Sequence, residues 1–481
     1  MSKRIIQTLA LLLVLGMSAA ALVAKRTAAQ QASVASSNTR NAAIVAATAE
    51  VLKETSEIRE LAILKPVKSG AQSRAAIEQM LIKNLDEQTT PAEMHATELS
   101  LRKFGLAPKE FQYRPFIIKL LTEQVAGYYD PRMQKFHLAD WLEVEGQKPV
   151  MSHELTHALQ DQHFNLRRFE KWPRGDSDAQ LAAHALIEGD ATLAMTIYMA
   201  KNPLVALAFS RSLLSGVSTE QFNQAPRAMR ESLIFPYLQG SEWATQLFKK
   251  GGWTMVSDAF TKLPLSTEQI LHAEKYFSYE RPVKIVLADL TSALNGKQQT
   301  ADSKQQTAVS NQPARNRTRG KILPTDHRPL PTAARPLPAA SWHRVDSDVN
   351  GEWNYYLILD QFLNAPQESK RAAAGWAGDR YAIYEGPSDQ VLLAQMTTWD
   401  TENDAREFFD AYTKRTRLRY ADAKEQETPA AQNSKAEVRN SYSWQTGDGL
   451  VTIELRGSRV VILEGVPAGV DSNKLSERLW S

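Results

Sequence analysis

The chain has 481 residues, of which 43% are hydrophobic and 23% are charged, and its formal net charge is +3. This length predicts two or three domains, and the composition excludes a wholly disordered chain. The small net charge gives no support for nucleic-acid binding, and no basic–aromatic binding motif accompanies it. The chain has no cysteine, which excludes disulfides, thiolate metal sites, iron–sulfur clusters, cysteine nucleophiles and a lipobox. Any metal site must therefore use His, Asp and Glu.

The N-terminus has the pattern of a secretory signal peptide. Residues 1–4 are basic, residues 5–24 are mainly apolar, and small residues at 19–21 or 27–29 offer cleavage sites. We therefore predict a signal peptide over residues 1–29 and export to the periplasm or the extracellular space. The alternative is an uncleaved segment that associates with the membrane and holds the rest of the chain outside, since about 20 apolar residues can span a bilayer.

The next part of the chain, residues 30–294, is predicted to be a mainly helical domain with a short β-hairpin. Apolar residues recur at three- and four-residue intervals over most of it. Helices are expected over residues 43–63, 73–86, from Thr90-Pro91, over 149–162 and 177–199, and on to about residue 260. Two short strands, residues 124–129 and 135–138, flank an Asp130-Pro131 turn.

The composition changes over residues 295–340, where Gln, Ser, Thr, Asn, Pro and Arg replace the apolar periodicity. Such a segment buries too little apolar surface to fold, so we expect a disordered linker or surface insertion. Alternation then returns, and residues 341–481 are predicted to form a small α+β domain. Its strands are expected over residues 380–385, 391–398, 449–455 and 460–464, and its helices over 401–416 and 472–479. The fold class of the whole chain is thus α+β.

The chemistry of the chain is indicated by His153-Glu-Leu-Thr-His157, an HExxH motif in an expected helix. Residues four apart on a helix project from the same face, so His153 and His157 can bind one zinc ion. Glu154 is rotated about 100° from His153 and can reach a metal-bound water as a general base. The competing interpretation is a pair of surface histidines on an amphipathic helix.

A catalytic zinc ion needs a third protein ligand, and two residues compete for this role. His163 has the spacing of the third histidine in the metzincin pattern HExxHxxGxxH. In that pattern the glycine breaks the helix, but this chain has Gln160 at the glycine position. On an unbroken helix, His163 is rotated about 280° from His153 and rises about 15 Å. Glu188 lies in an Ala- and Leu-rich helix, where an unpaired carboxylate would be costly. We therefore expect Glu188 to complete the site and His163 to lie outside it.

Other residues near the motif could assist it, and the sequence leaves their roles open. His184, one turn before Glu188, could be a ligand, a transition-state donor or, most simply, a core or supporting histidine. Tyr128 or Tyr129 could donate a hydrogen bond to an oxyanion, or could simply pack. Asp161 or Asp190 could orient a ligand histidine. The residues with a possible oxyanion-binding or supporting role are thus Tyr129, His184, Asp190 and Asp161.

His153-Glu-Leu-Thr-His-Ala158, followed by Asp161, resembles the active-site helix of the thermolysin-like gluzincins. The match is partial, because Ile187 and Thr192 stand where those proteins have Asn and Asp. A wider similarity, through residues 123–131, the HExxH helix, 185–192 and 266–272, is to uncharacterised bacterial exported proteins of the HExxH zinc metallopeptidase type. The resemblance implies a zincin-like catalytic domain, bound Zn²⁺ and a peptide or protein substrate, with an edge strand before the motif that binds peptide by strand addition.

We therefore predict a zinc-dependent metallopeptidase that hydrolyses peptide bonds outside the cytoplasm, with Glu154 as general base. The alternative is a non-catalytic envelope binding or scaffold protein with a structural or degenerate zinc site. A zinc hydrolase that acts on a different amide or ester is a third possibility. No GxSxG elbow, P-loop or dinucleotide-binding glycine motif stands in the strand–turn–helix context that it needs.

Overall fold

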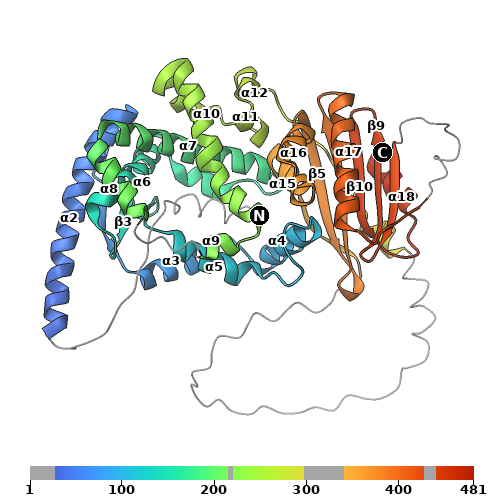
Figure 1. Ribbon diagram of the computed structural model, residues 1–481, viewed down its shortest axis with the longest axis horizontal. Coiled ribbons are helices and arrows are strands. Elements are labelled where there is room, and N and C mark those ends of the chain that lie inside the picture. The colour runs from blue at the N-terminus through green and yellow to red at the C-terminus, as the bar shows by residue number, and fades with distance from the viewer. Residues whose placement is uncertain (1–27, 215–219, 297–340, 427–439) are drawn as a thin grey trace, which may run out of the picture.

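The computed structural model describes residues 28–214, 220–296, 341–426 and 440–481 (Figure 1). The described residues form an α+β fold, as the sequence predicts. Most of the expected signal peptide and nearly all of the expected linker lie outside the described residues.

The part of the chain before residue 297 is mainly helical. Its helices are α2 (Ala28–Arg59), α3 (Arg74–Gln88), α4 (Pro91–Lys103), α5 (Tyr113–Gln124), α6 (Val144–Phe164), α7 (Ser177–Lys201), α8 (Pro203–Leu214), α9 (Glu220–Gln224), α10 (Arg227–Ala259), α11 (Thr267–Leu271), α12 (Ala273–Ser278) and α13 (Thr291–Asn295). Its strands are β1 (Lys68–Gln72), β2 (Gly127–Asp130) and β3 (Lys135–Ala139), and a 3-10 turn, η1 (Leu166–Lys171), follows α6.

These three strands form a small sheet in the order β1-β3-β2. β2 and β3 are the expected antiparallel hairpin, whereas β1 pairs in parallel with β3 and was not expected. β2 is an edge strand. The backbone N–H of Ala139 donates to the carbonyl of Ala126, so these two residues form a hydrogen-bonded pair. In an antiparallel pair of strands, hydrogen-bonded and non-hydrogen-bonded residue pairs alternate along the strand. The N–H groups of Gly127 and Tyr129 therefore point away from β3, toward the edge of the sheet that no other strand among the described residues pairs with.

Three boundaries differ from the sequence expectation. The helix expected over residues 43–63 is α2, which already ends at Arg59. The helix expected from residue 149 begins at Val144, so Pro149 lies inside α6 rather than in its first turn, where proline is most favourable. The strand expected from residue 124 begins at Gly127, because α5 continues to Gln124 before the chain straightens.

The C-terminal part is a seven-stranded antiparallel sheet in the order β4-β5-β6-β10-β9-β8-β7. Its strands are β4 (His343–Asp348), β5 (Trp376–Glu385), β6 (Val391–Trp399), β7 (Lys424–Glu425), β8 (Ser441–Thr446), β9 (Gly449–Arg456) and β10 (Arg459–Val466). Its helices are α15 (Gly351–Leu363), α16 (Pro366–Ala373), α17 (Glu402–Arg419) and α18 (Ser472–Trp480), with a 3-10 turn at η2 (Pro387–Asp389). The strands and helices expected from the sequence are all present, whereas β4, β7, β8, α15 and α16 were not expected.

Both faces of this sheet are buried, because alternate residues of a strand point to opposite sides. Ile383 and Ile462 belong to a core shared with α15 and α17, and this core continues into the N-terminal helices. Tyr384 and Leu463 belong to a second core with α18. Residues 287–294 also join this second core, although the sequence groups them with the N-terminal domain.

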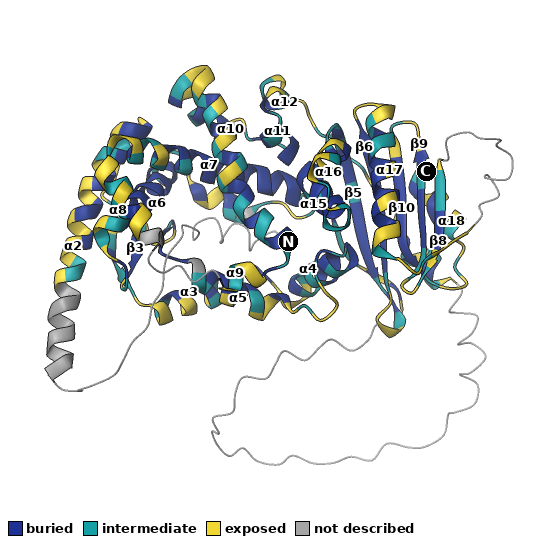
Figure 2. Ribbon diagram, viewed as in Figure 1, coloured by how far each residue is buried: buried dark blue, intermediate teal, exposed yellow. Residues whose placement is uncertain are grey.

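The helix α7 lies at the centre of the N-terminal part, and Figure 2 shows most of it buried. It packs against α6, α10 and α2. Its approach to α10 is very close, because a Cβ added at Gly189 would lie 2.2 Å from the backbone of Gly240. Only glycine at these positions lets the two backbones come so near.

The C-terminal part holds the first turn of α7. Asp348 accepts hydrogen bonds from the backbone N–H and the hydroxyl of Ser177, and both residues are buried. Arg380 donates to the carbonyl of Gly175 at 2.6 Å. The two parts are thus joined at the helix that carries Glu188.

Among the described residues, no single helix has both the length and the hydropathy of a membrane span. The bent pair Ser177–Lys201 and Pro203–Arg211, at 111°, meets those criteria only when its two members are taken together.

Candidate metal centre

The helix α6 presents His153 and His157 from one face, one turn apart, as the HExxH spacing predicts. Their rings lie 4.7 Å apart at 89° to one another, and the two Nε2 atoms are 3.1 Å apart. Both side chains are fully buried. The two imidazole nitrogens therefore converge on one point inside the protein.

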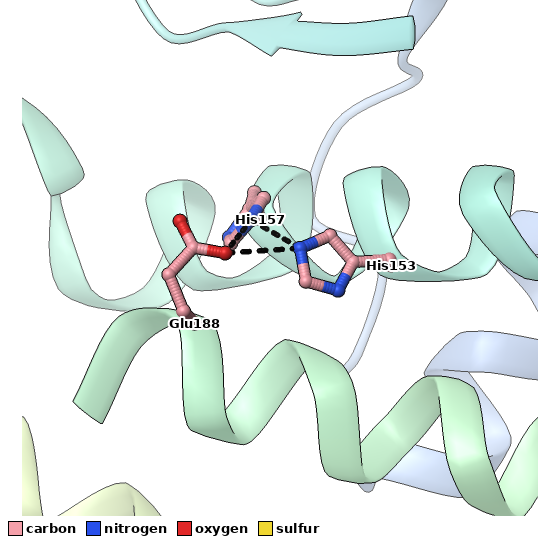
Figure 3. Close-up of side chains that lie close together, drawn as sticks. All are labelled: His153, His157 and Glu188. Carbon is pink, nitrogen blue, oxygen red and sulfur yellow. Dashed lines mark hydrogen bonds and ion pairs between the residues drawn. The ribbon is translucent and has the colours of Figure 1, made fainter. Parts of the chain in front are cut away.

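Glu188 reaches the same point from α7 (Figure 3). Its Oε2 lies 3.0 Å from His153 Nε2 and 3.4 Å from His157 Nε2, and the side chain is fully buried. One ligand atom from each of the three residues lies within 4.8 Å of the others, so this group could hold a metal ion. Two imidazoles and a carboxylate are ligands that zinc, among other first-row metals, accepts.

The charges of this group stabilise one another. Burial alone would lower the pKa of His157, but the Glu188 carboxylate raises it to about 9. Burial would raise the pKa of Glu188, whereas His157 and His153 lower it to about 2. The pKa of His153 is lowered, mainly by burial. A metal cation bound between these side chains would take the place of the proton that His157 carries without one.

Gln160 fixes the orientation of His157. Its Nε2 donates to the carbonyl of Ile187 at 3.0 Å and to Asp190 Oδ2 at 2.8 Å, so its Oε1 is the atom that faces His157 Nδ1, at 2.9 Å. An amide oxygen can only accept, so Nδ1 carries a proton, and in the neutral ring Nε2 keeps its lone pair for a metal ion. Asp190 is thus connected to His157, one of the two histidines of the motif, through Gln160.

Glu154 lies next to His153 on α6 and is also fully buried. Its Oε2 accepts a hydrogen bond from the backbone N–H of Tyr129 at 2.9 Å. Its Oε1 has no hydrogen-bond partner among the described residues. Burial raises the pKa of Glu154 to about 8. The backbone of β2 therefore fixes one oxygen of the Glu154 carboxylate.

His184 lies one turn before Glu188 on α7, and its Nε2 is 3.8 Å from Glu188 Oε1. Within the described ranges, neither of its ring nitrogens has a hydrogen-bond partner, although the side chain is 5% exposed. Burial lowers its pKa to about 4. A neutral imidazole with an N–H to donate therefore stands beside the metal-binding group.

Three of the proposed roles need correction. The hydroxyl of Tyr129 donates to Asp161 at 3.0 Å, so it is not free to donate to an oxyanion. Asp161 also accepts from the backbone N–H of Leu166, and it therefore supports the end of α6 instead of a ligand histidine. The hydroxyl of Tyr128 is likewise bound, to Gln72 at 2.6 Å. The strand β2 contributes a backbone donor where the sequence suggested a tyrosine hydroxyl.

His163 lies outside the centre, as the helix geometry predicts. Its Nε2 is 2.7 Å from the carbonyl oxygen of Ala62, on the outer side of α6. The sequence alone does not indicate the role of Gln160, or that of Tyr237, whose ring stacks on that of His153 at 5.9 Å. Gln160 lies one turn after His157, which is a local signal that could have identified it. Tyr237 is on α10, and no local pattern connects it to the motif.

Together, these observations define the class of protein as an α+β protein with a buried His–His–Glu group able to hold a metal ion. A family model described as a domain of unknown function (DUF8575) matches residues 337–475. No curated protein and no solved structure matches the chain. The matched residues cover most of the C-terminal part, so the metal centre lies outside them.

Proposed function

We propose that this chain is a zinc-dependent metallopeptidase that hydrolyses peptide bonds outside the cytoplasm. The observation that carries the proposal is the meeting of an HExxH helix with Glu188, while an oxygen of Glu154 beside them has no partner among the described residues. Two histidines and a glutamate leave a zinc ion one position for a reactant, which is the arrangement of catalytic sites. The gluzincin resemblance of the motif supports a zincin-like domain.

The residues of the chain would divide the work of hydrolysis. Zinc, when bound by His153, His157 and Glu188, would polarise the scissile carbonyl and acidify the attacking water. Glu154 Oε1 would accept a proton from that water and pass it to the leaving amide nitrogen. His184 would donate a hydrogen bond to the oxyanion, because it is neutral and has no other partner among the described residues.

The substrate would bind along the edge of β2 that faces away from β3. The N–H group of Gly127 points to this edge, whereas the N–H group of Tyr129 already donates to Glu154. An extended peptide that pairs with β2 would therefore run past Glu154 and the metal centre. This geometry supports a peptide rather than another amide or ester as substrate. Export rests on the sequence of residues 1–29 alone, and an uncleaved N-terminal segment would keep the enzyme at the membrane.

The proposal is tested with Glu154→Gln, which keeps the shape of the side chain and removes the base. Wild type is expected to bind about one zinc ion per chain and to cleave members of a peptide library. The variant should keep its zinc and lose activity by about 10²- to 10⁴-fold. Glu145→Gln is the matched control, because Glu145 lies on the same helix but is exposed and paired with Lys148. Full activity of Glu154→Gln on every peptide that wild type cleaves would refute the assignment.

One observation favours the non-catalytic alternative. His153, Glu154, His157 and Glu188 are all 0% exposed, which is typical of structural metal sites. In that case His184 would close the coordination as a fourth ligand. X-ray absorption of the zinc protein counts the imidazole ligands: two support the catalytic proposal, and three support a structural site.

A further inference from the structure

We propose that Arg59, at the end of α2, is a positioning residue of the metal centre. It would act through Asp190 and Gln160 on the ligand His157. It follows that α2 is a permanent part of the protein and not a pro-segment removed on activation. The inference rests on the metal centre of the proposed function, but not on peptide hydrolysis.

Arg59 and Asp190 form an ion pair in the interior. Arg59 Nε donates to Asp190 Oδ1 at 2.5 Å, and both side chains are 0% exposed. Arg59 Nη2 donates to Ser257 at 3.1 Å, and the guanidinium lies 4.5 Å from the ring centre of Trp253. Contacts with α7 and with the last turns of α10 therefore fix the position of the guanidinium group.

The pair continues to the metal centre without a break. The other oxygen of Asp190 holds the amide of Gln160, and Gln160 holds His157 Nδ1. Arg59 supplies the charge that makes a buried carboxylate tolerable at this place. Without Arg59, the Asp190 carboxylate would be a buried charge held only by an amide, and the amide would no longer be fixed relative to His157. Partners of this kind behind a ligand histidine change metal affinity by about 10- to 100-fold.

A second contact joins α2 to the other ligand. Thr55, one turn before Arg59, shares a hydrogen bond of 2.9 Å with Ser152, the residue before His153. Both hydroxyl groups are buried. One face of α2 thus supports α6 beside His153 and α7 beside Glu188. Any processing of the exported chain must therefore leave residues 55–59 in place.

The test measures zinc affinity of the full chain by competition with a chelator, together with thermal unfolding. Arg59→Met and Asp190→Asn are each expected to weaken zinc binding by about 10- to 100-fold. The Arg59→Met/Asp190→Asn double variant should bind zinc about as tightly as the single variant with the lower zinc affinity. Both substitutions interrupt the same chain of contacts to His157, so their effects should not add. Arg59→Lys keeps the charge without the planar fork, so it should fold and lose only part of the affinity.

Arg415→Met is the matched control. Arg415 forms an equally buried pair with Glu464, at 2.7 Å and 0% exposure, in the C-terminal part. This variant should lower the unfolding temperature without changing zinc affinity. If Arg59→Met and Arg59→Lys behave in the same way as this control, Arg59 is only structural and the proposal is wrong.

The remaining outcomes separate this inference from the proposed function. Additive losses in the Arg59→Met/Asp190→Asn double variant would show that Arg59 does not act through Asp190. A wild-type chain that binds no zinc would overturn both the metal centre and the inference. A wild-type chain that binds zinc but cleaves no peptide would overturn only the proposed function.

Discussion

The close approach of α7 and α10 leads to a specific prediction for Gly189→Ala. The added Cβ would lie 2.2 Å from the backbone carbonyl of Gly240. Carbon atoms in contact are separated by about 3.5 Å, so the helices must move apart by about 1.3 Å. Neither neighbour can rotate away, because the atoms that the Cβ meets are backbone. The clash must therefore be relieved by displacement of one helix.

The size of the effect follows from two opposing contributions. Overpacking of an interior costs about 1–3 kcal/mol, and a clash with backbone belongs at the upper end. Alanine in place of glycine inside a helix recovers about 1 kcal/mol. The net loss is about 2 kcal/mol, which corresponds to roughly 4–8 °C in the unfolding temperature of a domain of this size. Glu188 is the adjacent residue, so the same displacement should also weaken metal binding.

Both effects are measurable on one sample, by thermal unfolding and by zinc competition. Gly447→Ala is the control, because a Cβ there would meet nothing within 4 Å in its turn between β8 and β9. We expect it to change stability by less than about 0.5 kcal/mol. If Gly189→Ala matches this control in both measurements, the helices do not approach as closely as the structure indicates.

Three further predictions concern separate parts of the molecule. Gln160→Leu removes the acceptor of His157 Nδ1 and should weaken zinc binding by about 10- to 100-fold in chelator competition; unchanged affinity would contradict the tautomer assignment. Burial would raise the pKa of Glu464, but Arg415 and its basic neighbours lower it from 4.5 to about 2, so its stabilising contribution is present above pH 4.5 and lost toward pH 2. Urea unfolding should show wild type losing about 3 kcal/mol more than Glu464→Gln over that range, and parallel pH profiles would refute this. Thr90→Ala removes the capping box of α4 and should lower the unfolding free energy by about 1 kcal/mol; no loss would contradict the cap.

The parts of the centre that the sequence predicted depend on local geometry. His153 and His157 share a helix, and the period of the helix alone places them on one face. The prediction of Glu188 needed a further argument. A carboxylate buried in an apolar helix needs a partner, and a metal ion bound by the two histidines could be that partner. The structure brings these three residues together.

What the sequence did not predict depends on packing between distant segments. Arg59 and Asp190 are 131 residues apart, and no pattern in α2 distinguishes Arg59 from a surface arginine. The strand β1, Lys-Ser-Gly-Ala-Gln, has no β-branched residue or alternation and is a strand only because β3 lies beside it. The role of Tyr129 could not be predicted for a similar reason. The orientation of β2 decides whether the hydroxyl or the backbone N–H of Tyr129 reaches the centre.

Polar atoms without a hydrogen-bond partner among the described residues lie beside the centre, and the proposed function gives them a role. A buried polar group without a partner costs about 1–3 kcal/mol, and here Glu154 Oε1 and both nitrogens of His184 have none among the described residues. Glu154 cannot serve as a further ligand on the same helix face, because it is rotated about 100° from His153. In the proposed function, Glu154 and His184 would supply the base and the hydrogen-bond donor that cleavage of a peptide bond needs.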